Sequence, residues 1–229
     1  KFKALLVTES QSGEFSQNIS EQSIDDLPAG ELLIKNHYSS INYKDALSAS
    51  GHKGVTREYP HIPGIDAAGE VVASNDKRFK QGDKVIVTGY DLGMNHWGGF
   101  AQYIKVPNNW AVKCPENLGL KEAMLFGTAG FTAMLAIYKM QQLLAVKNPR
   151  ILVTGASGGV GSILMAILSE EYAQISVTTR SQSKNEAYLQ KLGADNIIYQ
   201  EEFQEMKNDK ALYPRRWDVI IDNLGGRQL

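Results

Sequence analysis

The sequence predicts an α/β protein in which a small antiparallel β-barrel or sandwich is followed by a doubly wound parallel sheet. Residues 1–117 form short apolar stretches separated by turns, with one helix-like stretch, a pattern typical of antiparallel β domains. From residue 118 the apolar residues take helical spacing, and strands rich in Ile and Val then alternate with helices, as in βαβ units. We therefore divide the chain into domains at 1–117 and 118–229.

The first domain is expected to hold five strands and one helix. Gly82 and Asp83 precede an apolar stretch and predict a tight turn before that strand. The expected strands are 3–9, 31–40, 67–74, 83–90 and 100–107, and the expected helix is 42–49.

The second domain is expected to open with two helices over 120–144 that are separated by a break near residues 127–130, where two glycines interrupt the helical spacing. In the usual strand order 3-2-1-4-5-6, the strand at 219–222 would be left as an exposed apolar edge, which favours aggregation. The strands expected to follow the helices are 151–155, 174–179, 196–199 and 217–225, and the helices between them are 161–172, 183–192 and 201–207.

Composition excludes several classes of function. The chain is 43% hydrophobic and 21% charged, and its formal net charge of -1 leaves no basic excess for nucleic acid. The single cysteine, Cys114, excludes an internal disulfide and a multi-cysteine zinc site, and it suits a reducing compartment. The N-terminus has only a short apolar run, too short for a signal peptide or a membrane span. We expect a cytoplasmic protein with no nucleic-acid or membrane partner.

The string VTGASGGVGS at 153–162 predicts a phosphate-binding loop. Gly155, Gly158 and Gly161 lie between an apolar strand and an amphipathic helix, where backbone N–H groups at a helix N-terminus can meet a pyrophosphate. The spacing is GxxGxxG rather than the commoner GxGxxG, so a purely structural tight turn is the alternative. A Walker loop is disfavoured because no Lys follows the last glycine.

The end of the next strand indicates which dinucleotide would bind. NAD-binding proteins usually place an acid there for the ribose hydroxyls, whereas Arg and hydroxyl groups suit a 2′-phosphate. This chain has Thr179, Arg180 and Ser181, with Lys184 close behind, and no acid at that point. The pattern favours NADP(H); the alternative is that Arg180 and Lys184, and Lys184 in particular, belong to the solvated start of a helix.

Five longer strings carry a resemblance to a known family: SSINYKDAL, YPHIPGIDAAGEV, VTGYDLGMNHWGGFAQY, FGTAGFTAM and VTGASGGVGS. Together they resemble the zinc-independent quinone oxidoreductase branch of the medium-chain dehydrogenases/reductases, and within it the group of the NADPH-dependent acryloyl-CoA reductases. The resemblance spans the whole chain and implies a GroES-like β-barrel followed by a Rossmann domain that is incomplete in this chain. It also implies a longer full-length protein that could form a homodimer.

The same resemblance argues against zinc. This chain has Gly64, Ile65 and Asp66 where zinc alcohol dehydrogenases carry a GHE motif, and it lacks their cysteines. The four histidines show no ligand spacing, so no metal site is expected. Three of them, His37, His52 and His61, are interpreted as surface or turn residues, and His96 is placed near the cleft by the resemblance.

The resemblance also implies the site residues. Tyr43 would lie against the nicotinamide, Asn42 and Asp45 would line the same cleft, and Gln200 stands where close relatives can have Arg, which would weaken one phosphate contact. The structural alternatives are a core aromatic for Tyr43, a helix-stabilising acid for Asp45 and a helix cap for Thr128. The residues expected to contact the cofactor are Tyr43, Thr128, Gly155, Ser157, Gly158, Gly159, Val160, Thr179, Arg180, Ser181 and Gln200, and those expected at the reacting groups are Tyr43, Asn42 and Asp45.

These features lead to one leading hypothesis and two alternatives. The first is NADPH-dependent reduction of an activated alkene such as acryloyl-CoA, in which hydride reaches the β carbon and the enolate oxygen needs a hydrogen-bond donor. Tyr43 is the first choice for that donor or for the proton source, with Asn42 as a second donor. The alternatives are a quinone or general enal/enone reductase and a non-catalytic NADPH-binding protein.

Overall fold

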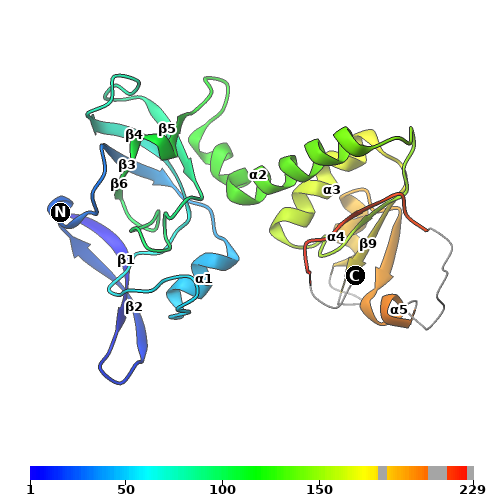
Figure 1. Ribbon diagram of the computed structural model, residues 1–229, viewed down its shortest axis with the longest axis horizontal. Coiled ribbons are helices and arrows are strands. Elements are labelled where there is room, and N and C mark those ends of the chain that lie inside the picture. Colours follow the sequence, from blue (N-terminus) through cyan, green and yellow to red (C-terminus); the bar gives the residue numbers. More distant parts are fainter. Residues whose placement is uncertain (180–184, 206–215, 226–229) are drawn as a thin grey trace. The chain divides into compact units, whose positions relative to one another are not determined.

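The computed structural model describes residues 1–179, 185–205 and 216–225, which form two compact units, 1–128 and 129–229 (Figure 1). Each unit has its own sheet and its own buried core. The division falls at a kink in α2 (Leu120–Leu143), where Gly127 has φ 50° and ψ −151°. The break predicted near residues 127–130 is therefore confirmed.

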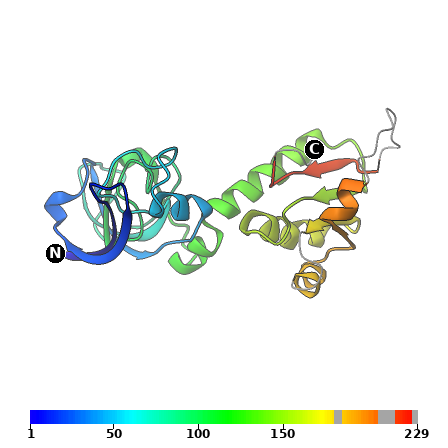
Figure 2. The same ribbon diagram turned by 90° about the horizontal axis from the view of Figure 1, so that it is seen from below.

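The first unit is antiparallel throughout its described strands, as predicted. A five-stranded sheet has the order β6-β3-β4-β5-β7, and a separate hairpin pairs β1 with β2. This hairpin lies along the rest of the unit through bridges Ala4–Ala101 and Val7–His61 (Figures 1 and 2). The elements are β1 (Phe2–Glu9), β2 (Phe15–Gln22), the 3-10 turn Ile24–Asp26, β3 (Leu32–Tyr38), α1 (Tyr43–Ala49), β4 (Asp66–Ser74), β5 (Lys84–Thr88), β6 (Tyr103–Val106), the 3-10 turn Asn108–Trp110 and β7 (Ala111–Lys113).

Two of these strands were not predicted. The sequence of β2, FSQNISEQ, is polar and has no buried residue, so it lacks the apolar alternation that marks a strand. The three-residue β7 is too short to show a period. The predicted strands succeed because alternate residues are buried: in β3, Leu32 and Ile34 face a core that also holds Val85 and Ile104.

The helix α2 contributes apolar side chains to both cores. Ala123 and Met124 belong to a cluster in the first unit, and Ala133, Ile137 and Met140 belong to the core of the second. Among the described residues, α2 is long and apolar enough to cross a membrane by length and composition alone, a test that core helices of soluble proteins also pass. Packing in the two cores accounts for only part of this apolar character, since 39% of the apolar window is buried and Leu125 and Phe131 are exposed.

The second unit holds a parallel sheet of order β10-β9-β8-β11, which is the 3-2-1-4 part of the predicted doubly wound order. The strand β11 lies at the edge, as predicted, and Ile220 on it is 47% exposed. Leu164, Met165 and Leu168 of α3 are completely buried in the core beside the sheet. The elements are β8 (Ile151–Val153), α3 (Gly159–Glu171), β9 (Ile175–Thr179), α4 (Glu186–Lys191), β10 (Asn196–Tyr199), α5 (Gln200–Glu205) and β11 (Val219–Ile221).

Candidate functional site

The glycine loop joins the end of β8 to the start of α3. Gly155 has φ +59°, a left-handed conformation that favours glycine, and Gly158 is the N-cap of the helix. A Cβ on Gly161 would lie 2.3 Å from the carbonyl oxygen of Gly155 and 2.6 Å from the Cα of Ala156. The helix therefore packs against the loop only because residue 161 has no side chain, and the start of α3 keeps its free N–H groups beside the loop.

A cavity of about 150 Å³ lies beside this loop, within the second unit. It brings together five of the residues that were expected to contact the cofactor, two of them glycines, and Thr178 adds a fourth polar side chain to those of Ser157, Thr179 and Gln200. The hydroxyl groups of Thr178 and Thr179 are buried and have no hydrogen-bond partner within the described part of the chain. Buried hydroxyls without a partner fit a ligand that supplies hydrogen bonds. The lining residues are Gly155, Ser157, Gly158, Thr178, Thr179, Gln200 and Leu224.

Other residues expected at the cofactor lie elsewhere. Gly159 and Val160 form the first turn of α3 and do not line this cavity. Arg180, Ser181 and also Lys184 fall outside the described residues.

A polar cluster that the sequence analysis did not predict lies at the base of the glycine loop and links the ends of β8 and β11. The hydroxyl of the buried Thr154 donates to the Asp222 carboxylate and accepts the backbone N–H of Asn223 at 2.9 Å. Burial raises the pKa of Asp222, but hydrogen bonds from Thr154, Leu224 and Gly225 outweigh it and lower the pKa overall. The end of β8 is thus fastened to the end of β11, where the glycine loop begins.

In the first unit, the buried carboxylate of Asp66 connects two of the predicted site residues. Its Oδ2 accepts hydrogen bonds from the Ser40 hydroxyl, from Asn42 Nδ2 at 2.9 Å and from the backbone N–H of Thr128 at 2.9 Å. Its Oδ1 accepts the Thr128 hydroxyl at 2.6 Å. A Cβ on Gly127 would lie 2.7 Å from Oδ2, so the kink in α2 depends on a glycine at this position.

Asp45 sits behind this network with both oxygens engaged. Oδ2 accepts the backbone N–H of Asn42 at 2.7 Å, and Oδ1 accepts that of Ile65 at 2.9 Å. Burial raises the pKa of Asp45, with a smaller contribution from the charge of Asp66. The geometry fits the structural alternative, in which Asp45 holds the start of α1 against the loop before β4.

Tyr43 is not a core aromatic, because 79% of it is exposed at the first residue of α1. That alternative for Tyr43 is therefore wrong. The structure brings Asn42 and Thr128 together on Asp66, while the Tyr43 hydroxyl stays accessible from solvent. The sequence string GID pointed to Asp66 only as a departure from a zinc motif, because the hydroxyl and amide groups that bond to Asp66 lie 24 to 62 positions away in the sequence.

The interpretation of His61 as a surface or turn residue is wrong. His61 is 2% exposed because its backbone pairs with that of Val7 in β1, which is distant in the sequence. The Val7 N–H donates to the His61 carbonyl oxygen at 2.8 Å, and the His61 N–H donates to the Val7 carbonyl oxygen at 2.9 Å. Burial lowers the pKa of its imidazole. The His96 side chain is engaged by protein groups: its Nε2 lies 2.6 Å from the Lys105 carbonyl oxygen, and its ring packs edge-on to Trp110. Within the described ranges, no group of three or more His, Cys, Asp or Glu could hold a metal ion.

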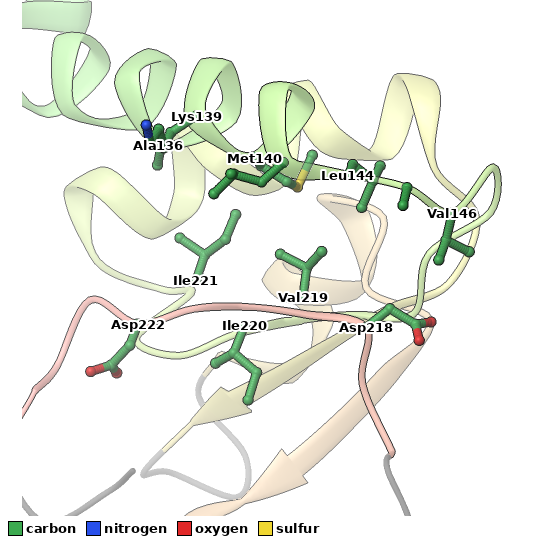
Figure 3. A pocket seen from close by; sticks show the side chains of 12 residues that line it. Ala136, Lys139, Met140, Leu144, Val146, Asp218, Val219, Ile220, Ile221 and Asp222 are labelled. Atoms are coloured by element: carbon green, nitrogen blue, oxygen red, sulfur yellow. The ribbon is translucent and has the colours of Figure 1, made fainter.

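A second cavity, of about 540 Å³, lies between the C-terminal half of α2 and the edge strand β11 (Figure 3). In this view Val219 and Ile221 point toward Met140, so the lining is mainly apolar. None of the predicted site residues lines it. The lining residues are Ala136, Lys139, Met140, Leu143, Leu144, Ala145, Val146, Asp218, Val219, Ile220, Ile221 and Asp222.

The second unit thus has the strand order, the glycine loop at the first strand and the adjoining polar cavity of a dinucleotide-binding α/β protein. The antiparallel domain that precedes it narrows the class further. Residues 28–116 match the family model described as the alcohol dehydrogenase GroES-like domain.

Comparison with known proteins gives the family. Acrylyl-CoA reductase AcuI of Ruegeria pomeroyi is 42% identical over 231 residues, which are 100% of this chain and 69% of that protein. The Bacillus subtilis protein named "Putative quinone oxidoreductase YhfP" is 43% identical over 98% of this chain and 68% of its own length. Its crystal structure with NAD bound has a TM-score of 0.90 over 99% of this chain and 68% of that one. The yhdH oxidoreductase of Salmonella enterica in complex with NADP is 39% identical, with a TM-score of 0.89 over 98% of this chain and 68% of that one.

The chain belongs to the medium-chain dehydrogenase/reductase superfamily, in the branch of the quinone oxidoreductases and acrylyl-CoA reductases. It is an oxidoreductase that uses a nicotinamide cofactor. The family resemblance and the fold predicted from the sequence are both confirmed. The individual site residues stay predictions.

Proposed function

We propose that this protein reduces activated alkenes with NADPH and that its substrate is an enoyl thioester such as acryloyl-CoA. The observation that carries the choice of NADPH is the cavity beside the glycine loop. Thr178 and Thr179 line it, their buried hydroxyls have no hydrogen-bond partner among the described residues, and no carboxylate is among its described lining residues. Hydroxyls without an acid suit a 2′-phosphate better than a bare ribose. The 42% identity to an acrylyl-CoA reductase supports the substrate class.

The bound cofactor would supply the hydride, and residues of this chain would hold it and manage charge on the substrate. In the second unit, the N–H groups at the start of α3 and the hydroxyls of Ser157 and Thr179 are assigned to phosphate groups. In the first unit, Asn42 and Thr128 are assigned to the nicotinamide end. Asp45 is assigned to fixing the start of α1, because each of its oxygens accepts a backbone N–H.

Tyr43 is the donor assigned to the enolate oxygen. When hydride adds to the β carbon of the enoyl group, negative charge moves to the carbonyl oxygen, and an O–H aimed at that oxygen lowers the barrier. The Tyr43 ring is exposed, so its hydroxyl can reach a substrate. The same hydroxyl could then deliver a proton to the α carbon.

Zinc has no role in this proposal. The position where zinc enzymes carry their GHE motif is occupied by Gly64, Ile65 and Asp66, and the Asp66 oxygens already accept four hydrogen bonds. A homodimer and a cytoplasmic location also stay predictions. The second candidate function is reduction of quinones or simple enals and enones, which the similarity to the putative quinone oxidoreductase YhfP supports and which the same residues could serve.

A substrate panel at one NADPH concentration tests the proposal. We expect NADPH oxidation with acryloyl-CoA to exceed that with simple quinones and enones. Equal turnover, or none with the thioester, would contradict the assignment of an enoyl thioester. Tight NADPH binding without turnover on any alkene or quinone would instead favour a non-catalytic NADPH-binding protein.

Charge reversal at the end of β9 tests the choice of cofactor. Arg180→Glu should weaken NADPH binding roughly 10- to 100-fold and leave NADH nearly unchanged, since a hydrogen bond to a charged group is worth about 1.5–3 kcal/mol. Lys184→Glu makes the same charge change four residues later and is the matched control, for which we expect a smaller loss. Unchanged discrimination in Arg180→Glu would count against the 2′-phosphate assignment.

A further inference from the structure

The Asp66 carboxylate and the Ser40 hydroxyl oxygen together accept every side-chain hydrogen that Asn42 and Thr128 can donate. The two amide hydrogens of Asn42 point to Ser40 Oγ and to Asp66 Oδ2, both at 2.9 Å. The single hydroxyl hydrogen of Thr128 goes to Asp66 Oδ1 at 2.6 Å. Neither side chain therefore has a hydrogen left to donate to a ligand.

These hydrogen bonds allow the Asn42 side-chain amide only one orientation. An ionised carboxylate accepts hydrogen bonds and cannot donate them, so a flipped Asn42 amide would set its carbonyl oxygen against Asp66. The carboxylate itself is fixed, because Asp66 is fully buried and also accepts the Thr128 backbone N–H and the Ser40 hydroxyl. Gly127, with φ +50°, lets the backbone of α2 come this close.

We propose that Asp66 is a positioning residue that makes Asn42 and Thr128 hydrogen-bond acceptors, which select the carboxamide NH₂ of the nicotinamide. This amide is the donor of the nicotinamide ring, and acceptors complement it. The same arrangement excludes Asn42 and Thr128 as donors to the enolate oxygen, which the negative charge of Asp66 would also repel. The enolate donor then falls to Tyr43. The inference rests on the proposed function, because it requires a nicotinamide cofactor at these residues.

The test compares two cofactors that differ in this one group. The 3-acetylpyridine analogue of NADP⁺ keeps the carbonyl but carries a methyl group in place of the NH₂. We expect the wild-type protein to bind the analogue roughly 5- to 10-fold more weakly than NADP⁺, as measured by titration of the two Kd values. In Asp66→Asn the new amide can donate to Asn42 and Thr128, and the ratio of the two Kd values should fall toward one.

The ratio of the two Kd values distinguishes a positioning role of Asp66 from a general loss of structure at the site. A variant that merely loosens the site weakens both cofactors alike and leaves the ratio unchanged. Ser40→Ala is the matched control, because it removes a hydrogen bond to Asp66 and the acceptor of one Asn42 amide hydrogen but keeps Asn42 Nδ2 and the Thr128 hydroxyl bonded to the carboxylate, so both acceptor oxygens stay oriented. Its ratio should stay that of the wild type. If Asp66→Asn does not fold, Thr128→Val removes one acceptor at nearly constant shape and should also lower the ratio.

The outcomes distinguish this inference from the proposed function. Failure of the wild-type protein to bind NADP⁺ would overturn the proposed function. Binding of NADP⁺ with equal affinity for the analogue, or an unchanged ratio in Asp66→Asn or in Thr128→Val, would overturn only the role of Asp66. A lowered ratio in Ser40→Ala would overturn it as well, because orientation would then not depend on the carboxylate.

Discussion

Gly161→Ala tests whether the third glycine of the loop is there for packing. The new Cβ would lie 2.3 Å from the Gly155 carbonyl oxygen, whereas ordinary contacts begin at 3.4 Å, so the loop or the helix has to move by the difference. The neighbours are backbone atoms and cannot rotate away. Overpacking of this kind costs about 1–3 kcal/mol. For a protein of this length that corresponds to a fall in Tm of roughly 2–12 °C.

Gly159→Ala is the matched control, since it makes the same exchange in the same first turn of α3. Its Cβ would meet only the Cβ of Ala129, at an ordinary 3.6 Å. Replacing a helical glycine at an uncrowded position stabilises by about 0.4–1 kcal/mol, because the unfolded chain loses freedom. Thermal unfolding followed by circular dichroism should therefore place Gly161→Ala below the wild type and Gly159→Ala at or above it. Equal Tm values for the two variants would refute the packing argument.

Two further predictions concern stability. Because the pKa of the buried His61 is lowered, the unfolded state binds a proton at a higher pH than the folded state does. The free energy of unfolding should therefore fall as the pH falls below about 6.5, by at most about 1.4 kcal/mol per pH unit for one proton. Urea unfolding of His61→Gln should lose this part of the slope, and an unchanged slope would assign it to other groups. Thr154→Val removes one of the donors to the Asp222 carboxylate and the side-chain acceptor of the Asn223 N–H, so it should cost about 1–3 kcal/mol in urea unfolding. A loss below about 0.5 kcal/mol would show that water replaces the hydroxyl.

The parts of the structure that the sequence predicts well are those whose signals are local. The glycine loop lies between a run of buried residues, Ile151 to Val153, and a helix whose buried residues recur at helical spacing. Gly127 and Gly130 likewise placed the break in α2. Strand order in the second unit followed because right-handed βαβ connections leave few alternatives.

What the sequence could not predict depends on contacts between distant residues. Asp66 and Thr128 are 62 positions apart, and only the folded chain shows that one carboxylate bonds to both groups of Thr128. His61 was misplaced because its burial comes from pairing with Val7. The polar strand β2 exists because β1 supplies its hydrogen bonds, and its own residues carry no periodic signal. The predicted role of Asn42 as a second donor to the substrate changed for the same reason, since its amide hydrogens bond to Ser40 and Asp66, and sequence periodicity does not reveal these partners.

The surroundings of Asp66 also bear on the absence of zinc from the proposed mechanism. A metal ion bound to the buried Asp66 would have to displace donors from Ser40, Asn42 and Thr128, which are themselves only partly buried. A buried donor left without an acceptor costs about 1–3 kcal/mol, and a partly buried one costs less because water can reach it, so cation binding would still begin with an unfavourable contribution from each displaced donor. Hydrogen bonds from neutral side chains already satisfy this carboxylate. An acid in this part of the fold can therefore act by orienting amide and hydroxyl groups rather than by supporting a metal.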